Sequence, residues 1–495
     1  MNGTGGNGKR SRKSVPSQIT LALLANFSNI SPGMNMGFSA VAIPYLHHLT
    51  SNQISWFASI ASLATPIGCM VSGPIADRFG RRWAIGVVNA TTLIGWSIVA
   101  TAYYVTDHQY EILLSGRFMT GLAAGLCGTP AAIYMAEVAS SELRSVFTTW
   151  VSLFYAIGIF FVYVLGLILQ NNWGAICLIA AAFPIFGMTF LLLFIPESPP
   201  WLVTKRRFDE AQKNLCRLYG TKTCNNDVNA ELQGLIKHNR PKDKLQQSTL
   251  PQQFVKKVKM LMKKNFLKPY LLVLTYFFFQ QFTGIFVIMF YAIDIVNAAK
   301  IELDSYITIV IIALVRVVGM VLLSFISKHI GRRPLSLTSG VGITLSMIGL
   351  GSYIMAIRNG LISAEQHSFL SIIPLLFLIF YFLISTVGFY PLPFALCSEV
   401  YPRNIRGTAA GISTATNFLF NFVIVKLYPT MVAGLGDCGV FYFYGAMGLL
   451  GTIFVFFYLP ETRGKSLEEI QEFFGNKKEK DMNLEQALKN KNVDL

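Results

Sequence analysis

The 495-residue chain has little charge: Asp, Glu, Lys and Arg make up 13% of it, against 53% hydrophobic residues. Soluble domains contain about 25% charged residues, so this composition excludes a set of soluble domains. Seven cysteines, an odd number, provide no disulfide framework. The sequence also lacks a metal-ligand cluster, a nucleophile elbow and a phosphate-cradling loop. We therefore expect neither an enzyme nor a bound cofactor.

What the chain has instead is a series of long apolar segments. A membrane-spanning helix needs ~20 mostly apolar residues, because its backbone polar groups must bond within the segment. The hydropathy pattern predicts an all-α membrane protein with twelve such helices. The predicted spans are 19–46, 55–76, 83–105, 111–136, 146–169, 174–195, 267–293, 304–327, 335–357, 369–397, 408–431 and 438–459.

A long hydrophilic stretch separates six predicted spans from the other six. The net charge of +16 comes from basic residues in alternate connectors, which follows the positive-inside rule and argues against nucleic-acid binding. Both termini and the central loop are therefore expected in the cytoplasm, and 467–474 is expected to form a short amphipathic helix. The predicted parts are a tail over 1–18, a six-helix bundle over 19–195, a central loop with short helices over 196–268, a six-helix bundle over 269–459 and a tail over 460–495.

Charged motifs at the ends of the spans occur twice, at nearly the same spacing. The three pairs are Gly80-Arg81-Arg82 with Gly331-Arg332-Arg333, Glu137…Arg144 with Glu399…Arg406, and Pro196-Glu197-Ser198 with Pro460-Glu461-Thr462. A duplicated set of spans with matching connectors indicates a transporter of two halves, with the substrate path between them.

The charged motifs have two interpretations: ion pairs that open and close as a gate, or charges that only fix the membrane topology. Arginine and carboxylate side chains form bidentate pairs, and Asp77 and Glu137 lie near arginines at the same predicted membrane face. Such pairs can hold two helix bundles together and release them when the bundles rock apart. The alternative is that the charges only fix the topology, and the duplication favours the gate.

Amides in the seventh predicted span are candidates for solute binding. Gln280 and Gln281 lie in an otherwise apolar segment, where an unpaired amide costs a few kcal/mol. They are expected to face a cavity or a second helix, and Gly284 makes an interruption of the helix easy. The alternative is that the amides only join two helices.

A Pro-x-Pro sequence in the tenth predicted span is a second candidate. Pro391 and Pro393 remove backbone donors and predict a broken helix, which is tolerated at mid-membrane where it lines a cavity. Phe389 and Phe394 are then placed to stack on a sugar face, although both can equally be core aromatics. Asn417 in the eleventh span, with Asn421 one turn on, supplies further amides.

The chain resembles the sugar porter family of the major facilitator superfamily, in particular insect facilitated trehalose or glucose transporters. The resemblance rests on Gly73…Asp77-Arg78-Phe79-Gly80-Arg81-Arg82, Gly116-Arg117, Pro196-Glu197-Ser198-Pro199, Gln280-Gln281-Phe282-Thr283-Gly284 and Pro460-Glu461-Thr462-Arg463-Gly464-Lys465-Ser466. It implies the major facilitator fold, a small-molecule sugar substrate, a monomer and the plasma membrane. It also implies an inner salt-bridge network of Asp77, Arg81, Arg82, Glu137, Arg144, Glu197, Arg332, Arg333, Glu399, Arg406 and Glu461.

Several positions depart from the family pattern. Phe286 replaces a usual Asn, Ser152 a usual Gln and Phe394 a usual Trp. The resemblance makes Ser152 and Asn35 candidate solute contacts. Arg316 stands where the family has Asn or Gln, in the middle of the eighth span. An arginine at that depth is expected to be functional. It contacts the substrate, an anion included, or it pairs structurally, with Asp294 as the nearest acidic residue in sequence.

One further departure concerns energy coupling. Proton-driven sugar porters have an Asp in the first span near the arginine of the fourth, and here Asn35 takes that place beside Arg117. An amide does not titrate, so the resemblance implies facilitated diffusion of a hexose or trehalose by alternating access. Two other interpretations remain open: transport of a polyol or organic anion, and a sugar sensor that transports little.

Overall fold

The computed structural model describes residues 15–105, 107–140, 143–219, 226–238, 264–326, 330–361, 370–401, 406–463, 465 and 469. Within these ranges every regular element is a helix and there is no strand. Nine of the helices formed by these residues are long and apolar enough to cross a membrane. The predicted amphipathic helix at 467–474 lies almost entirely outside the described residues.

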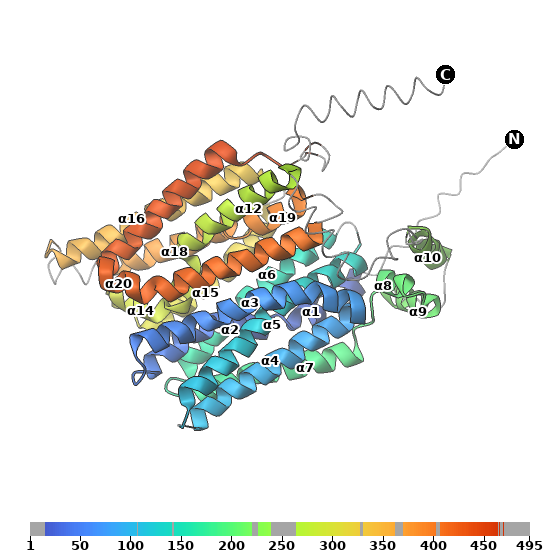
Figure 1. Cartoon of the computed structure of the whole chain (residues 1–495), viewed down its shortest axis with the longest axis horizontal. Coiled ribbons are helices and arrows are strands. Elements are labelled where there is room, and N and C mark those ends of the chain that lie inside the picture. The colour runs from blue at the N-terminus through green and yellow to red at the C-terminus, as the bar shows by residue number, and fades with distance from the viewer. Residues whose placement is uncertain are drawn as a thin grey trace, which may run out of the picture. The chain divides into compact units, whose positions relative to one another are not determined.

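The described chain packs as two compact units. The first takes its residues from Met1–Phe38 and Ile67–Gln247. The helices of this unit are α1 (Val15–Phe27), most of α2 (Ile30–Ala42), the later part of α3 (Ser51–Phe79), α4 (Arg81–Tyr104), α5 (Gln109–Val138), α6 (Arg144–Ile168), α7 (Trp173–Leu193), α8 (Pro199–Thr204), α9 (Phe208–Tyr219) and α10 (Asn226–His238). In Figure 1, α4 runs beside α5 and α7, in agreement with their contacts.

Small residues bring α4 and α5 into close contact. A Cβ atom on Gly95 would lie 2.8 Å from the backbone N of Thr120, and one on Gly116 would lie 2.8 Å from the backbone N of Val99. Close approach of backbones through small residues is the usual way in which helices associate in lipid. These glycines therefore set the spacing of the pair.

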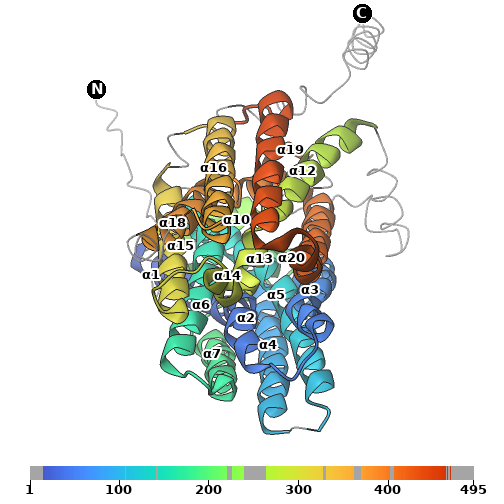
Figure 2. The same ribbon diagram turned by 90° about the vertical axis from the view of Figure 1, so that its left-hand side faces the viewer.

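The second unit takes its residues from Ser39–Pro66 and Ser248–Leu495. The elements of this unit are η1 (Ile43–Tyr45), the first part of α3, α12 (Lys264–Phe282), α13 (Ile285–Phe290), α14 (Ala292–Ala298), α15 (Ser305–Ile326), α16 (Arg332–Arg358), α18 (Ile372–Val387), α19 (Leu392–Val400) and α20 (Arg406–Tyr458). Figure 2 shows α15, α16 and α18 together, and α18 contacts both of the others.

Two of the predicted spans in this unit are broken at the positions that the sequence indicates. Gly284, with φ +84°, separates α12 from α13, and the residues from Gly388 to Pro391 separate α18 from α19. The helix α20 covers two predicted spans and has a break at Gly436, where φ is +70°. The first predicted span, 19–46, is also divided, into α1 and α2.

Replacing Gly284 by Ala should destabilise the protein by roughly 2–4 kcal/mol. The left-handed backbone costs an L-residue ~1–2 kcal/mol, and the new Cβ would lie 2.6 Å from the Tyr444 ring. Thermal unfolding of the purified protein in detergent measures the loss. Gly407→Ala, at an exposed position with open space around it, is the control. Equal midpoints for the two variants would show that the backbone at Gly284 is not constrained.

Candidate functional site

An ion-pair cluster lies at the start of α4 in the first unit. The Arg81 guanidinium contacts both carboxylate oxygens of Glu137, with N–O distances of 3.0–3.2 Å. It also contacts Asp77, one helical turn earlier, at 3.2 Å. The Arg81 and Glu137 side chains are 12% and 20% exposed, so the pair is partly shielded from water. Bidentate geometry and shielding make this pair stronger than an exposed one.

The Glu197 carboxylate closes the N-terminus of α4. It accepts hydrogen bonds from the backbone N–H groups of Arg81 at 2.9 Å and Arg82 at 3.2 Å. Backbone N–H groups in the first turn of a helix lack intrahelical partners, and the helix dipole favours an anion there. The hydroxyl of the next residue, Ser198, donates to Glu137. One short segment therefore binds both the helix end and the acidic partner of Arg81.

The second unit repeats the main contacts of this arrangement at the start of α16, although Arg332 contacts only one oxygen of its glutamate. Glu461 accepts from the backbone N–H groups of Arg332 at 2.9 Å and Arg333 at 3.1 Å. The Arg332 guanidinium contacts Glu399 at 3.1 Å, and the Thr462 hydroxyl donates to Glu399 at 2.6 Å. The duplicated motifs of the sequence are thus duplicated contacts.

The second arginine of each motif binds the last turn of another helix. Arg82 donates to the carbonyls of Leu191 at 3.2 Å and Leu192 at 2.9 Å, at the end of α7. Arg333 donates to the carbonyl of Phe456 at 2.5 Å, at the end of α20. Carbonyls in the last turn of a helix lack intrahelical partners and attract cations. Each motif therefore connects the start of one helix, the end of another helix and the short segment that carries the capping glutamate.

The sequence did not assign the hydroxyls of Ser198 and Thr462 a role. The signal was present, because a hydroxyl residue follows the glutamate in both copies. The side chains of Arg144 and Arg406, which the resemblance places in the network, lie outside the described side chains. Every ion pair that the described residues of the network form lies within one unit.

The two capping glutamates differ in acidity. Burial raises the pKa of Glu197 above its usual range, and hydrogen bonds from the Ser198, Arg82 and Arg81 backbones offset this only in part. Burial also acts to raise the pKa of Glu461, but four backbone hydrogen bonds outweigh it, so that pKa lies below its usual range. Glu461 therefore keeps its charge to lower pH than Glu197 does.

Asn35 lies beside Arg117, as the resemblance implies. The guanidinium donates to the Asn35 backbone carbonyl at 2.7 Å and to the side-chain oxygen of the same residue. Arg117 also lies over the Phe38 ring, with 5.9 Å from its guanidinium carbon to the ring centroid. All three side chains are fully buried. The carboxamide oxygen thus holds the arginine without carrying a titratable proton.

In the second unit the predicted amides form a ladder between helices. Gln281 donates to Asn417 at 2.6 Å and accepts from Asn421 at 3.1 Å. Asn421 in turn accepts from the Ser62 hydroxyl at 2.5 Å. The ladder joins α12, α20 and the first part of α3, and it leaves the Asn417 Nδ2 atom buried without a hydrogen-bond partner.

Gln280 lies at the break between α18 and α19. Its Nε2 donates to the Tyr390 carbonyl, while its Oε1 is buried and unpartnered. The Tyr390 ring lies 5.9 Å from the Phe286 ring, measured between centroids. Gln280 therefore has one free acceptor beside aromatic side chains, which suits a solute hydroxyl.

The other predicted contact residues are more dispersed. Phe389 is 1% exposed and makes an edge contact with Tyr276, with 5.0 Å between centroids. Phe394 is half-buried and makes an edge contact with Phe277 at 4.9 Å. Ser152 is exposed on α6. In this structure Phe389 is a core side chain, whereas Phe394 and Ser152 keep accessible surface.

Arg316 is 2% exposed, on the buried face of α15. Its guanidinium carbon lies 4.7 Å from the Tyr390 ring centroid, and its Nη1 contacts the Met289 sulfur. In the described part of the chain no carboxylate pairs with it, Asp294 included. Burying an ion costs several kcal/mol, and a desolvated cation–π contact returns about 2. The charge is therefore under-compensated.

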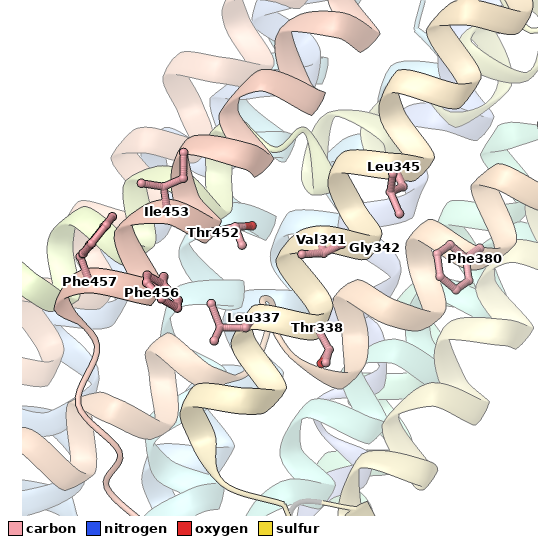
Figure 3. A pocket seen from close by; sticks show the side chains of 10 residues that line it. All are labelled: Leu337, Thr338, Val341, Gly342, Leu345, Phe380, Thr452, Ile453, Phe456 and Phe457. Atoms are coloured by element: carbon pink, nitrogen blue, oxygen red, sulfur yellow. The ribbon is translucent and has the colours of Figure 1, made fainter.

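Figure 3 shows the side chains that line an apolar groove of about 590 Å³, one of which, Phe456, also contacts Arg333. Several of its side chains are exposed, as lipid-facing residues are, and none of the predicted site residues lines it. Thr338 and Thr452 are its only residues with side-chain hydroxyls or other polar groups. The lining residues, from α16, α18 and α20, are Leu337, Thr338, Val341, Gly342, Leu345, Phe380, Thr452, Ile453, Phe456 and Phe457.

Comparisons with known proteins identify the family of the chain. A family model described as sugar (and other) transporter matches residues 15–474. The facilitated trehalose transporter Tret1 of Culex quinquefasciatus is 29% identical over 92% of this chain and 85% of that protein. The Polypedilum vanderplanki relative of that name is 29% identical over 92% and 88%. The chain spans about half the length of the Aedes aegypti and Anopheles gambiae relatives, 54% and 55%.

The fold matches a solved structure as well. The inward open conformation of the xylose transporter XylE from E. coli superposes with a TM-score of 0.74 at 20% identity, covering 92% of this chain and 100% of that one. A structure of XylE described as a major facilitator superfamily proton:xylose symporter gives a TM-score of 0.71 at 21% identity, covering 93% and 99%. The predicted fold family is confirmed.

Replacing Glu461 should loosen the start of α16. Glu461→Ala removes a charged acceptor of four backbone N–H groups, two of them in the first turn of α16, and should cost about 1–3 kcal/mol. Glu461→Gln keeps one acceptor oxygen and should cost less. Because the pKa of Glu461 is lowered in the fold, its contribution is present at neutral pH and is lost as pH falls through that pKa.

Thermal unfolding from neutral to acidic pH measures both effects. The wild type and Glu461→Ala should differ in midpoint at neutral pH and converge on acidification. A difference that stays constant across this range would mean that the carboxylate charge does not support the helix end.

Proposed function

Because the chain belongs to the sugar (and other) transporter family, we propose that it is a facilitative transporter of a hexose or trehalose in the plasma membrane. The two insect relatives that the chain spans for most of their length are facilitated trehalose transporters, which supports that choice of solute. The family and the relatives are transporters and not enzymes. We propose a monomer of twelve spans with both termini and the α8–α10 segment in the cytoplasm.

The observation that carries the proposal is the duplicated contact set at α4 and α16. Equal charge clusters at equivalent ends of two repeats suit a mechanism in which both repeats move about a central site. We propose that the pairs Arg81–Glu137 and Arg332–Glu399 hold the cytoplasmic helix ends when the transporter faces outward. They release or exchange partners when it faces inward.

Contacts of α3 with α20 support the same mechanism. Ser55 donates to the Lys426 carbonyl at 3.0 Å, and the Lys426 ammonium lies 4.4 Å from the Trp56 ring centroid. Residues 51–66 thus bind a helix of the other sequence half within one compact unit. We propose that this contact closes the outer side while the inner side is open.

The solute site proposed here is the amide and aromatic cluster of α12, α13 and α20. The free Gln280 Oε1 accepts a solute hydroxyl and the free Asn417 Nδ2 donates to a solute oxygen. Neutral donors and acceptors beside aromatic rings are what a sugar requires. Buried polar atoms that lack a partner cost stability, and a function explains why they are kept.

Uptake of radiolabelled glucose, trehalose and fructose into oocytes that express the chain tests the function. We expect saturable uptake of at least one sugar, with little difference between acidic and neutral medium. Gln280→Leu should raise the KM of that sugar about tenfold, because one hydrogen bond to the solute is lost. Gln212→Leu on α9, outside the proposed site, is the matched control. Protein that reaches the surface and moves none of the sugars would contradict the proposal.

The uniport mechanism has its own test in Asn35→Asp. The new carboxylate would lie beside Arg117 and could exchange a proton with the transport path. Uptake by this variant should become dependent on the pH gradient, while wild-type uptake stays independent of it. Measurement in proteoliposomes with and without an imposed gradient compares the two. Wild-type accumulation of sugar against its own gradient, driven by protons, would rule out uniport.

A further inference from the structure

Arg316 is a buried cation without an anionic partner among the described residues. Its neighbours are the Tyr390 ring and the Met289 sulfur, and its Nε donor has no hydrogen-bond partner. The residues of α15 that are most exposed, such as Leu314 and Val318, lie on another face of the helix. Arg316 therefore does not reach toward lipid headgroups, and the fold holds its charge inside the protein.

Other unsatisfied polar atoms lie along the same helices. The Thr386 side chain is packed against Gly319, one turn of α15 from Arg316, and the Thr386 hydroxyl has no partner. Gln280 binds the carbonyl of Tyr390, whose ring Arg316 covers, and its Oε1 is also free. Arg316 and Gln280 thus both contact Tyr390, one at the ring and one at the carbonyl, and each has an unpartnered polar atom.

These groups have a complementary ligand chemistry. A guanidinium binds a carboxylate more strongly than any neutral acceptor, because each hydrogen bond is charge-assisted. The free Gln280 oxygen requires a hydroxyl donor on the same ligand. A neutral sugar satisfies the amide and leaves the cation uncompensated. An inorganic anion satisfies the cation and leaves the amide free.

We propose that Arg316 forms a carboxylate subsite and that the chain transports sugar acids, that is, polyhydroxylated carboxylates. This inference rests on the proposed function, since it uses the same solute site and names the class of sugar that it prefers. The carboxylate binds Arg316 and the hydroxyls bind Gln280. Transport of such a solute without a coupled ion moves one negative charge in each cycle.

Glucuronate and glucose are the matched probes, since they differ by a carboxylate in place of a hydroxymethyl group. In voltage-clamped oocytes we expect glucuronate uptake to be accompanied by a current of the sign of anion entry, and glucose uptake to carry none. Glucuronate should also inhibit glucose uptake, because both occupy one site. Glucose uptake without glucuronate uptake, current or inhibition would overturn the inference and leave the proposed function standing.

Variants distinguish a direct contact of Arg316 with the carboxylate from the effect of the net positive charge of the protein. Arg316→Gln should lower the ratio of glucuronate to glucose kcat/KM about 10- to 100-fold, and Arg316→Lys should keep part of it. Arg358→Gln removes an exposed arginine at the end of α16 and should leave the ratio unchanged. An equal loss for both solutes in Arg316→Gln would show that the arginine is structural.

Binding to purified protein tests the inference independently of transport. Glucuronate should raise the unfolding midpoint of the wild type more than glucose does, and Arg316→Gln should abolish that difference. If oocytes move neither these solutes nor trehalose or fructose, the proposed function fails, while glucuronate binding that depends on Arg316 would still support the subsite. Equal stabilisation by both solutes would overturn it.

Discussion

A polar side chain inside a membrane span has no bulk water to bond, so it must find a partner within the protein or bind a solute. This constraint explains the amide ladder of Gln281, Asn417 and Asn421, in which two of the three amide nitrogens bond an amide oxygen of a neighbour. It also explains why Arg117 is held by Asn35. Arg316 Nε is an exception, because it is buried without a hydrogen-bond partner, and our proposal of a carboxylate subsite starts from it.

At the helix ends the same constraint requires hydrogen-bond partners for the terminal backbone groups. The backbone donors of α4 and α16 and the terminal carbonyls of α7 and α20 need partners, and two short motifs provide them through Glu197, Glu461, Arg82 and Arg333. Because these groups also hold the pairs that we propose as the gate, opening the gate disturbs the helix ends. In this proposal a change in one ion-pair cluster therefore also changes how the ends of the neighbouring helices are held.

The motifs at the starts of α4 and α16 make the same kinds of hydrogen bond, but their capping glutamates differ in pKa. The pKa of Glu197 is raised by burial and that of Glu461 is lowered by hydrogen bonds, although both cap a helix in the same way. The two caps therefore respond differently to acidification, because Glu197 takes up a proton at a higher pH than Glu461 does.

The sequence by itself determined the helical architecture, the duplicated motifs and the breaks at Gly284 and Pro391, because these follow from local hydropathy and backbone chemistry. It also identified Arg316 as unusual. The count of twelve spans stays a prediction. Only the tertiary structure decided which partners each polar group has: that Gln281 bonds other amides, that Phe389 lies in the core and that Arg316 lacks a carboxylate among the described residues. Partners come from helices far apart in the chain, and their choice depends on packing that no local pattern encodes.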